Sequence, residues 1–344
     1  MNGFNRICAC IVGLVLFVAG LLKLMDPLGA SLVLQDYLSF FHLSFLRFAS
    51  GFLGLTFALA EALTGAALIA GVWRRVTAMV SGILLAFFTI LTFIILIANP
   101  AMDCGCFGQA IKLSHGGTFV KNLLLCALWS LAFLPLRDYG KAQRMKYVSF
   151  ALAAVSLLLF TLYSCLSIPL MDFTSLKTGT ELGADAAAEF YFYDAAGEYV
   201  EAEALEGKTV LISVYKPEGI SARQADRLSA FARKASAAGF RPFVLVASAP
   251  GEIEGGLASP ALLGISYFAD KRMLMSLNRS NGGVTYLSDG QVIRKWSGSA
   301  LPDQAALRQM QDSDPLEMMV RAKNKGNLQF QAFLLYVAAV LLLL

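Results

Sequence analysis

Long apolar runs dominate the first half of the chain and return at its last printed residues. Five of the runs are long enough, at about 1.5 Å of helix per residue, to cross a hydrocarbon core about 30 Å thick. We predict membrane-spanning helices over residues 7–25, 45–72, 76–98, 119–136 and 147–168. A run over residues 328–344 is only just long enough, and we keep it as a candidate sixth span whose end lies beyond the printed residues.

Between the fifth and sixth runs the pattern changes, because charged residues return and apolar stretches shorten to strand length. Alternating or buried-type patterns predict strands over 190–193, 209–215 and 242–247, and a hairpin of 284–287 with 292–296 across Ser288-Asp289-Gly290. Helical periodicity covers 222–238, where Ser221 is the expected N-cap, and also 270–279 and 303–311. This order predicts a soluble α/β domain with a mixed sheet and helices on its faces.

Composition supports a membrane protein with a soluble part. The 344 residues are 57% hydrophobic and only 15% charged, whereas soluble proteins carry about 25% charged residues. Membrane lipid is therefore the first expected partner, and the scattered net charge of +4 gives no reason to expect nucleic-acid binding. We divide the chain into a four-helix membrane domain (1–136), a loop with a fifth helix (137–168), a soluble domain (169–325) and a hydrophobic segment (326–344).

Charges in the short loops predict the orientation, since cytoplasmic loops are enriched in Lys and Arg. Cations lie in the loops after the second and fourth spans: Arg74, Arg75, Arg137, Lys141, Arg144 and Lys146. Acidic residues lie in the loops after the first and third spans: Asp26, Asp36 and Asp103. The N-terminus is then inside, and the third loop and the soluble domain are expected on the outer, oxidising side.

The third loop carries the most concentrated candidate chemistry, Asp103-Cys104-Gly105-Cys106-Phe107-Gly108. Its two glycines are expected at sharp bends of the backbone. Two cysteines separated by one residue close a very small ring, so a bond between them is expected to be strained and readily reduced. Three interpretations stay open: a redox pair, a structural disulfide, or a copper(I) site, because copper(I) accepts two soft ligands. His115 is a candidate base, with a simple loop role as the alternative, and Lys112 and Lys121 add positive charge.

Glu61 lies deep in the second predicted span. An ionised carboxylate at that depth is costly unless it is paired, so an intramembrane acid is a functional-site hypothesis. Lys23, near the outer end of the first span, is its most available partner, although a lysine there can instead extend to the headgroups. The candidate site residues are thus Cys104, Cys106, Glu61 and Lys23, with no metal site assigned.

Four motifs in order resemble DoxX-like membrane proteins of the MauE branch: Arg6 with the run to Lys23-Leu24-Met25-Asp26-Pro27, then Glu61, the Cys104-Gly105-Cys106 loop, and Thr118-Phe119-Val120-Lys121-Asn122. The resemblance covers residues 1–136 and implies a four-helix bundle in a bacterial inner membrane. The MauE branch is associated with methylamine utilisation and with disulfide formation in a periplasmic dehydrogenase subunit, and the DoxX branch with quinol-coupled oxidases.

The hairpin region, with Gly283-Val284-Thr285-Tyr286-Leu287 as its first strand, resembles the second half of a thioredoxin-like domain. The dithiol expected after the strand ending at Tyr215 is replaced by Lys216-Pro217-Glu218-Gly219-Ile220-Ser221, and Val284 stands where a cis-proline is expected. The resemblance therefore implies a redox-inactive module that docks a periplasmic client. A MauE-like part fused to such a domain resembles the form found in Bacteroidetes-type bacteria.

These observations favour a membrane thiol-disulfide oxidoreductase that exchanges electrons between periplasmic clients and a membrane carrier, with quinone as the candidate cofactor. One cysteine attacks a client disulfide or receives the client's thiolate, and the other resolves the mixed disulfide, while Glu61 and Lys23 manage protons or hold the helices. The alternative is a non-enzymatic membrane scaffold with a structural Cys104–Cys106 bond.

Overall fold

The computed structural model describes residues 3–135, 142–183, 190–249, 257 and 260–343. Within these residues, six helices are long and apolar enough to cross a membrane. The chain separates into two compact units, one made of Met1–Cys165 with Phe330–Leu344 and the other of Leu166–Gln329. The predicted fold class, a helical membrane bundle with a soluble α/β domain, is confirmed.

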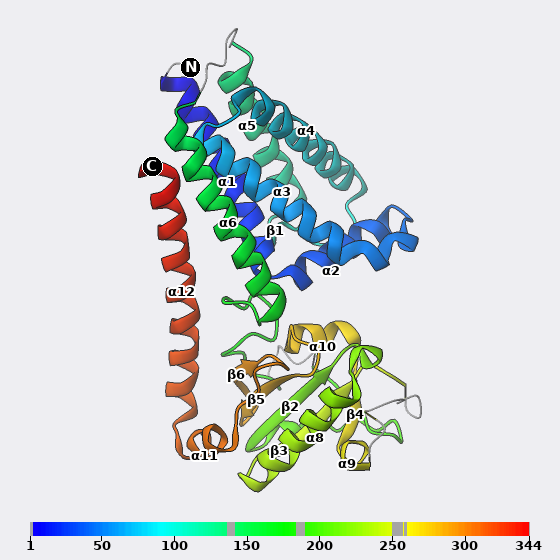
Figure 1. Ribbon diagram of the computed structural model, residues 1–344. Helices are drawn as coiled ribbons and strands as arrows, with labels where there is room; N and C mark the ends of the chain where they lie inside the picture. Colours follow the sequence, from blue (N-terminus) through cyan, green and yellow to red (C-terminus); the bar gives the residue numbers. More distant parts are fainter. Residues whose placement is uncertain (1–2, 136–141, 184–189, 250–256, 258–259, 344) are drawn as a thin grey trace. The chain divides into compact units, whose positions relative to one another are not determined.

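The membrane unit contains the four N-terminal spans, α1 (Gly3–Met25), α3 (Ser50–Ala70), α4 (Arg74–Ala98) and α5 (His115–Phe133). A 3-10 turn, η1 (Ser44–Ala49), leads into α3. Helix α1 packs against both α3 and α5, and α4 packs against α5 (Figure 1). The end predicted for the fourth span, Leu136, lies outside the described residues.

Small residues let α1 and α3 approach closely. A Cβ added to Gly20 would lie 2.5 Å from the backbone nitrogen of Ala62, and one added to Gly65 would overlap the backbone of Phe17. Contacts of this kind replace the hydrophobic effect as the source of helix association in lipid. Arg6 secures the far end of the pair, since its guanidinium donates to the backbone oxygens of Leu68 and Ile69 at the end of α3.

A short helix, α2 (Pro27–Phe40), lies where the sequence predicts only a loop. Asp26 is its N-cap, accepting a hydrogen bond of 2.9 Å from the Gly29 backbone, and Pro27 opens its first turn. The break predicted at the end of the first span is therefore a helix-to-helix junction. Helix α2 packs on α3 and on the short strand β1 (Cys106–Gln109).

Two further spans complete the membrane unit, α6 (Arg144–Leu166) and the end of α12 (Pro315–Leu343). Phe160 stacks on Phe333 with ring centroids 4.6 Å apart. Helix α12 begins ahead of the predicted residue 328, because Met318 and Met319 in its first turns pack against the core of the α/β unit. The candidate sixth span is thus the second half of a longer helix.

The α/β unit is built on a five-stranded sheet of order β4-β3-β2-β5-β6. Its strands are β2 (Lys208–Val214), β3 (Arg241–Val246), β4 (Ser266–Phe268), β5 (Gly283–Ser288) and β6 (Gln291–Trp296). Strands β2, β3 and β4 pair in parallel, whereas β5 and β6 are antiparallel to their neighbours. Asp289 and Gly290 both have positive φ, as the tight hairpin turn requires.

Helices cover both faces of this sheet. Val210 and Ile212 of β2 point into a core shared with α8 (Ala222–Ala237) and α11 (Gln304–Asp312), while Leu211 points into the opposite core with α10 (Lys271–Leu277). This alternation is the period of a strand buried on both faces. Two short helices, α7 (Glu201–Leu205) and α9 (Pro260–Leu263), complete the unit. The predicted Ser221 N-cap is confirmed by a capping box with Gln224.

The strand predicted at 190–193 is wrong. Phe190 and Phe192 are buried in the second core, which explains the alternating pattern, but only Tyr193 forms β-bridges, to Tyr199 and Phe268. The segment thus lies along the sheet without a ladder of its own. Strand β4, which the sequence analysis did not predict, takes that edge instead.

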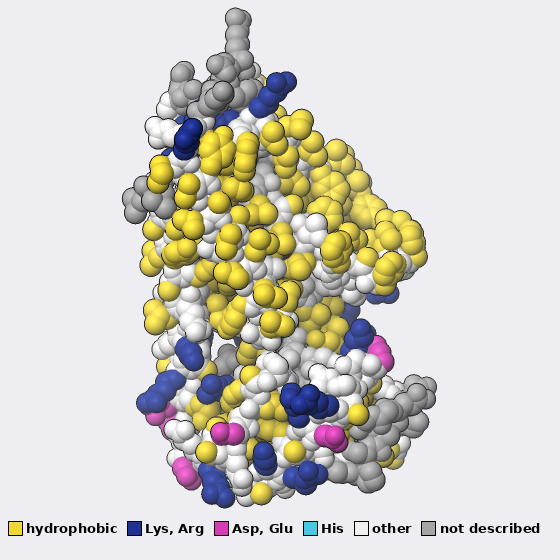
Figure 2. All heavy atoms as spheres, in the orientation of Figure 1, with side chains coloured by type: hydrophobic (Ala, Val, Ile, Leu, Met, Phe, Trp, Pro, Cys, Tyr) yellow, Lys and Arg dark blue, Asp and Glu magenta, His cyan; other side chains and the backbone are white. Residues whose placement is uncertain are grey.

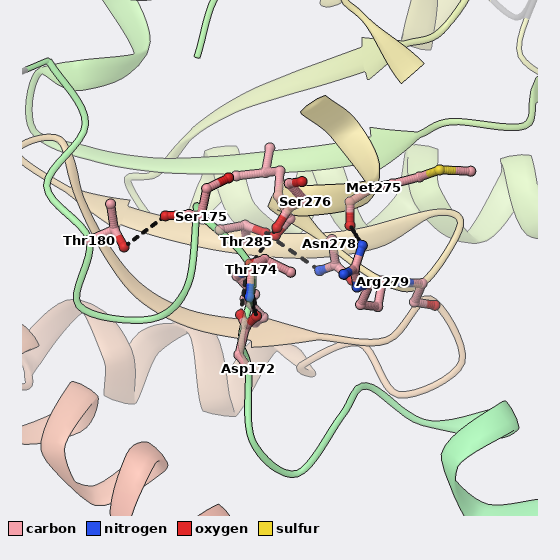
Figure 3. A network of polar contacts seen from close by, with 12 residues as sticks. Asp172, Thr174, Ser175, Thr180, Met275, Ser276, Asn278, Arg279 and Thr285 are labelled. Atoms are coloured by element: carbon pink, nitrogen blue, oxygen red, sulfur yellow. Dashed lines mark hydrogen bonds and ion pairs between the residues drawn. The ribbon is translucent and has the colours of Figure 1, made fainter. Parts of the chain in front are cut away.

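A buried ion pair fixes the first segment of the α/β unit to its hairpin. Lys295 Nζ on β6 lies 2.6 Å from Asp172 Oδ2, and Asp172 also accepts from the backbone and hydroxyl of Thr174 (Figure 3). Burial alone would raise the pKa of Asp172, but Lys295 and the Thr174 hydrogen bonds outweigh it and hold that pKa below its usual value. The neighbouring Asn278 side chain donates to the Val284 backbone.

Candidate functional site

The predicted pairing of the two intramembrane ions is confirmed. Lys23 Nζ on α1 lies 2.5 Å from Glu61 Oε2 on α3, and Glu61 is only 3% exposed. The pair forms because Gly20 and Ala62, within one turn of these residues, let the two helix backbones meet. Lys23 also lies over the ring of Phe88, 5.4 Å from its centroid. Neither charge is therefore left alone in the apolar interior.

The cysteine loop is a shaped turn that closes over the end of α1. Gly105 and Gly108 both have positive φ, +58° and +61°, and the Gly108 nitrogen donates to the Gly105 oxygen at 3.0 Å. A side chain at Gly105 would overlap Val33 of α2. The sharp bends predicted from the two glycines are confirmed, and they are bends that other residues adopt only with strain.

Tyr37 of α2 holds the loop from the other side. Its hydroxyl donates a hydrogen bond of 2.6 Å to the backbone oxygen of Cys104. Burial, together with the nearby Cys106 and Cys104, raises the pKa of the Tyr37 phenol, so the group stays a donor. Tyr37 was not predicted as a site residue, because nothing in the sequence between the first two spans indicates a contact with the cysteines.

The two thiols, both free, have different surroundings. Cys104 is 4% exposed, whereas Cys106 is half-buried. Burial raises the pKa of the Cys104 thiol, and the nearby Cys106 and Asp103 act in the same direction. The Thr118 hydroxyl and the Lys121 ammonium oppose this rise. Cys104 is thus a protected thiol, and Cys106 is the sulfur that another molecule reaches more easily.

The ring of His115 contacts parts of the loop other than the two thiols. Its Nδ1 lies 3.1 Å from Asn99 Oδ1 and its Nε2 lies 3.0 Å from the backbone oxygen of Met102, so both ring nitrogens tie the loop to the start of α5. The simple loop role left open for His115 is the one observed. Of the two predicted lysines, Lys112 contacts Asp103 in an exposed pair at 3.1 Å, while Lys121 lies over the ring of Phe107 at 4.9 Å.

Two cavities meet at this site. The larger, about 460 Å³, is almost wholly apolar and is bounded by α2, α3, α4 and the cysteine loop, with Lys23, Cys104 and Cys106 in its wall. The smaller, about 20 Å³, is lined by Lys23, Glu61, Cys106, Lys121 and Asn122 among others. A space of this size is large enough for one water molecule with several polar partners. Lys23, Cys106 and Phe88 belong to both walls, so they lie between the two cavities, and the smaller cavity is the one that Glu61, Lys121 and Asn122 also line.

The structure therefore brings all four predicted site residues to one end of the bundle: Cys104, Cys106, Lys23 and Glu61. Asn122 joins them, and its side chain donates to the Phe88 oxygen at 3.2 Å and to Thr92 Oγ1 at 3.1 Å. Among the described residues, no group of three or more His, Cys, Asp or Glu is placed to hold a metal ion.

Residues 1–136 match the family model described as methylamine utilisation protein MauE. No curated protein and no solved structure matches the chain. The family match confirms the predicted MauE resemblance of the four-helix part. It also covers every residue of the site, from Lys23 on α1 to Asn122 beside the smaller cavity.

Proposed function

We propose that this membrane protein transfers electrons between thiol clients and a membrane-dissolved quinone through Cys104 and Cys106. The observation that carries the proposal is that both cysteines form part of the wall of a large apolar cavity inside a membrane bundle. A structural Cys104–Cys106 disulfide requires no such cavity, whereas a carrier dissolved in lipid needs one in order to reach the cysteines.

The reaction balances as two linked exchanges. In the first, a client dithiol attacks the Cys104–Cys106 disulfide, a mixed disulfide forms and resolves, and the client leaves as a disulfide with both cysteines reduced. In the second, the two thiols give two electrons and two protons to quinone, which becomes quinol, and the Cys104–Cys106 bond forms again. The net change is oxidation of one client dithiol by one quinone.

The different burial of the two thiols divides these tasks. Cys106, half-buried, takes the client sulfur, and Cys104, buried against the cavity, completes the exchange with the carrier. Lys23 donates toward the carrier in the apolar cavity, and Glu61 exchanges protons with Lys23 across the 2.5 Å contact. A group that borders both cavities is well placed to move a proton between them.

The α/β unit supplies the client in this proposal. Its order, with a parallel β2–β3 pair followed by the β5–β6 hairpin, supports the thioredoxin-like interpretation. Where that family carries its dithiol, Lys216 and Asn281 instead hold each other through two hydrogen bonds of 3.0 and 2.8 Å. In this proposal the α/β unit binds a client, and thiol–disulfide exchange takes place in the membrane part. The MauE resemblance supports a bacterial inner membrane location, and the loop charges support an orientation with this unit in the periplasm.

Trapping of mixed disulfides tests the proposal. The full chain is produced in bacterial membranes as Cys104→Ser, Cys106→Ser and, as a control, Cys165→Ser, an exposed cysteine outside the site. After acid quenching and alkylation, we expect Cys104→Ser to accumulate adducts in which the Cys106 thiolate has attacked a client disulfide, the reverse of the first exchange, because the Cys104 thiol that would release Cys106 from this mixed disulfide is gone. Cys106→Ser should accumulate none. A pair that stays oxidised throughout, with no adduct in either variant, would support the scaffold alternative.

A further inference from the structure

The larger cavity opens on the side of the bundle that faces lipid. Six of its lining residues are also exposed. Phe41 at 37% and Leu43 at 39% follow the end of α2. The other four lie on two spanning helices: Phe57 of α3 at 41%, and Phe87, Ile90 and Ile94 of α4 at 47%, 61% and 38%. The opening therefore includes the gap between α3 and α4, which carries most of these residues.

The surface around this opening is apolar. Ile83 and Ile97 of α4 are 63% and 69% exposed, and Phe52 of α3 is 74% exposed. Figure 2 shows hydrophobic side chains gathered over α3 and α4. Exposed apolar side chains on a membrane-spanning helix face the hydrocarbon of the bilayer. A ligand therefore reaches the opening through lipid.

An aromatic pair spans the opening. The rings of Phe57 and Phe87 are stacked, with centroids 6.1 Å apart and planes within 2° of parallel. The pair bridges two helices that otherwise make fewer contacts than α1 and α3 do. The two rings form an aromatic edge of the opening against which a planar ring or an unsaturated chain can pack.

The inner end of the cavity has a different chemistry. Lys23, Cys104 and Cys106 lie there, and the Glu61 contact uses one of the three donors of the Lys23 ammonium. An acyl chain of a phospholipid can neither accept a hydrogen bond from the Lys23 ammonium nor react with the thiols. A quinone can do both, since its carbonyl oxygen accepts hydrogen bonds and its ring accepts the electrons of the thiols.

We propose that the cavity is a binding site for a quinone with an isoprenoid tail, which enters sideways from the bilayer between α3 and α4. Its ring lies at the Lys23 and cysteine end, and its tail leaves past Phe57 and Phe87. The volume, about 460 Å³, is within the range of ordinary ligand sites, and it leaves most of a long tail in the lipid. This inference rests on the proposed function and adds the site and the route of the carrier.

A matched series of substitutions tests the route. Ile83, Ile90 and Ile97 are spaced by two helical turns, so they share one face of α4, and their exposures are similar. Of the three, Ile90 lines the cavity. The full chain is reduced, placed in liposomes containing ubiquinone-10, and quinol formation is followed as a function of the quinone content of the lipid. Ile90→Trp should raise the half-saturating quinone content about tenfold by crowding the opening. Ile83→Trp and Ile97→Trp should leave it unchanged.

A binding measurement separates this inference from the proposed function. The Cys104→Ser/Cys106→Ser variant is mixed with a photoreactive quinone in liposomes, and the labelled peptides are identified by mass spectrometry. Labelling of α3 and α4 near the opening, reduced by Ile90→Trp and unaffected by Ile83→Trp, supports the site even if no electrons are transferred. Equal labelling in all variants, or a phospholipid retained in the cavity that ubiquinone-10 does not displace, overturns the inference. Quinol formation that is equal in all three tryptophan variants also overturns it while leaving the proposed function intact.

Discussion

Replacing Lys23 by methionine is the sharpest perturbation of the membrane unit. The substitution keeps the length of the side chain and its packing near Phe88 but removes the ammonium group that lies 2.5 Å from Glu61. Glu61 is 3% exposed, and the adjoining cavity of about 20 Å³ has room for only about one water molecule in place of the lost cation. The variant therefore leaves an acid buried without its cation.

The expected loss follows from this burial. Removing one partner of a buried ion pair costs about 3–5 kcal/mol. Glu61→Gln should cost less, about 1 kcal/mol, since Lys23 is a long side chain that can extend toward the headgroups. The double variant Lys23→Met/Glu61→Gln should recover about half of the stability lost in Lys23→Met, which corresponds to a coupling energy of about 3 kcal/mol.

Unfolding of the full chain in detergent, followed as loss of helical signal on titration with a denaturing detergent, measures these differences. Lys112→Met is the matched control, because its pair with Asp103 is exposed, with side chains 73% and 56% accessible, and should contribute nothing measurable. Equal stabilities of Lys23→Met and Glu61→Gln, or strictly additive effects in the double variant, would refute the reasoning.

Three more outcomes follow from other contacts. Gly20→Ala should destabilise the membrane unit in the same detergent titration, because the new methyl group meets the α3 backbone at 2.5 Å. Lys121→Met should raise the pKa of Cys104 further, since its charge favours the thiolate, and alkylation rates measured against pH report the shift. Lys295→Met should destabilise the α/β unit by about 3–5 kcal/mol near neutral pH. The pKa of Asp172 is lowered in the folded protein, so the loss of unfolding free energy has its full size above the ordinary pKa of an aspartic acid. The loss shrinks as the pH falls through the lower pKa that Asp172 has in the folded protein, and denaturant unfolding at several pH values measures it.

Each of these outcomes has an internal control. Gly116→Ala introduces a methyl group with no atom within 4 Å and should be neutral. Asp103→Asn should lower the pKa of Cys104, opposite to Lys121→Met, because Asp103 disfavours the thiolate. Shifts of the same sign in both variants would contradict the electrostatic account. A pH-independent effect of Lys295→Met would show that the loss comes from packing.

The sequence was sufficient to predict those elements that a single large free-energy contribution determines. Apolar runs of spanning length leave no alternative to a helix in lipid, so the long spans were predictable. The Lys23–Glu61 pair was predictable for the same reason, since isolated ions are costly there. The bends at Gly105 and Gly108 followed from the residue type.

What the sequence left undetermined depends on tertiary contacts. Helix α2 is too short to show as a span, yet it supplies Tyr37 and one wall of the cavity. The segment 190–193 has the alternation of a strand because two phenylalanines are buried, but an edge partner decides whether a ladder forms. Helix α12 begins early because methionines in its polar half have a core to pack on. Each of these three features depends on residues that are distant in the sequence, so none can be recognised from the segment itself.

The most direct measurement of the central claim follows Cys104 and Cys106 themselves during one turnover. The reduced full chain is placed in lipid with ubiquinone-10, and the peptide that contains both cysteines is examined by mass spectrometry while quinol is quantified. Our account predicts loss of two hydrogen atoms from this peptide and formation of one quinol for each chain, and neither change in the Cys104→Ser/Cys106→Ser variant. Thiols that persist in the presence of quinone, or equal quinol formation by that variant, would contradict it.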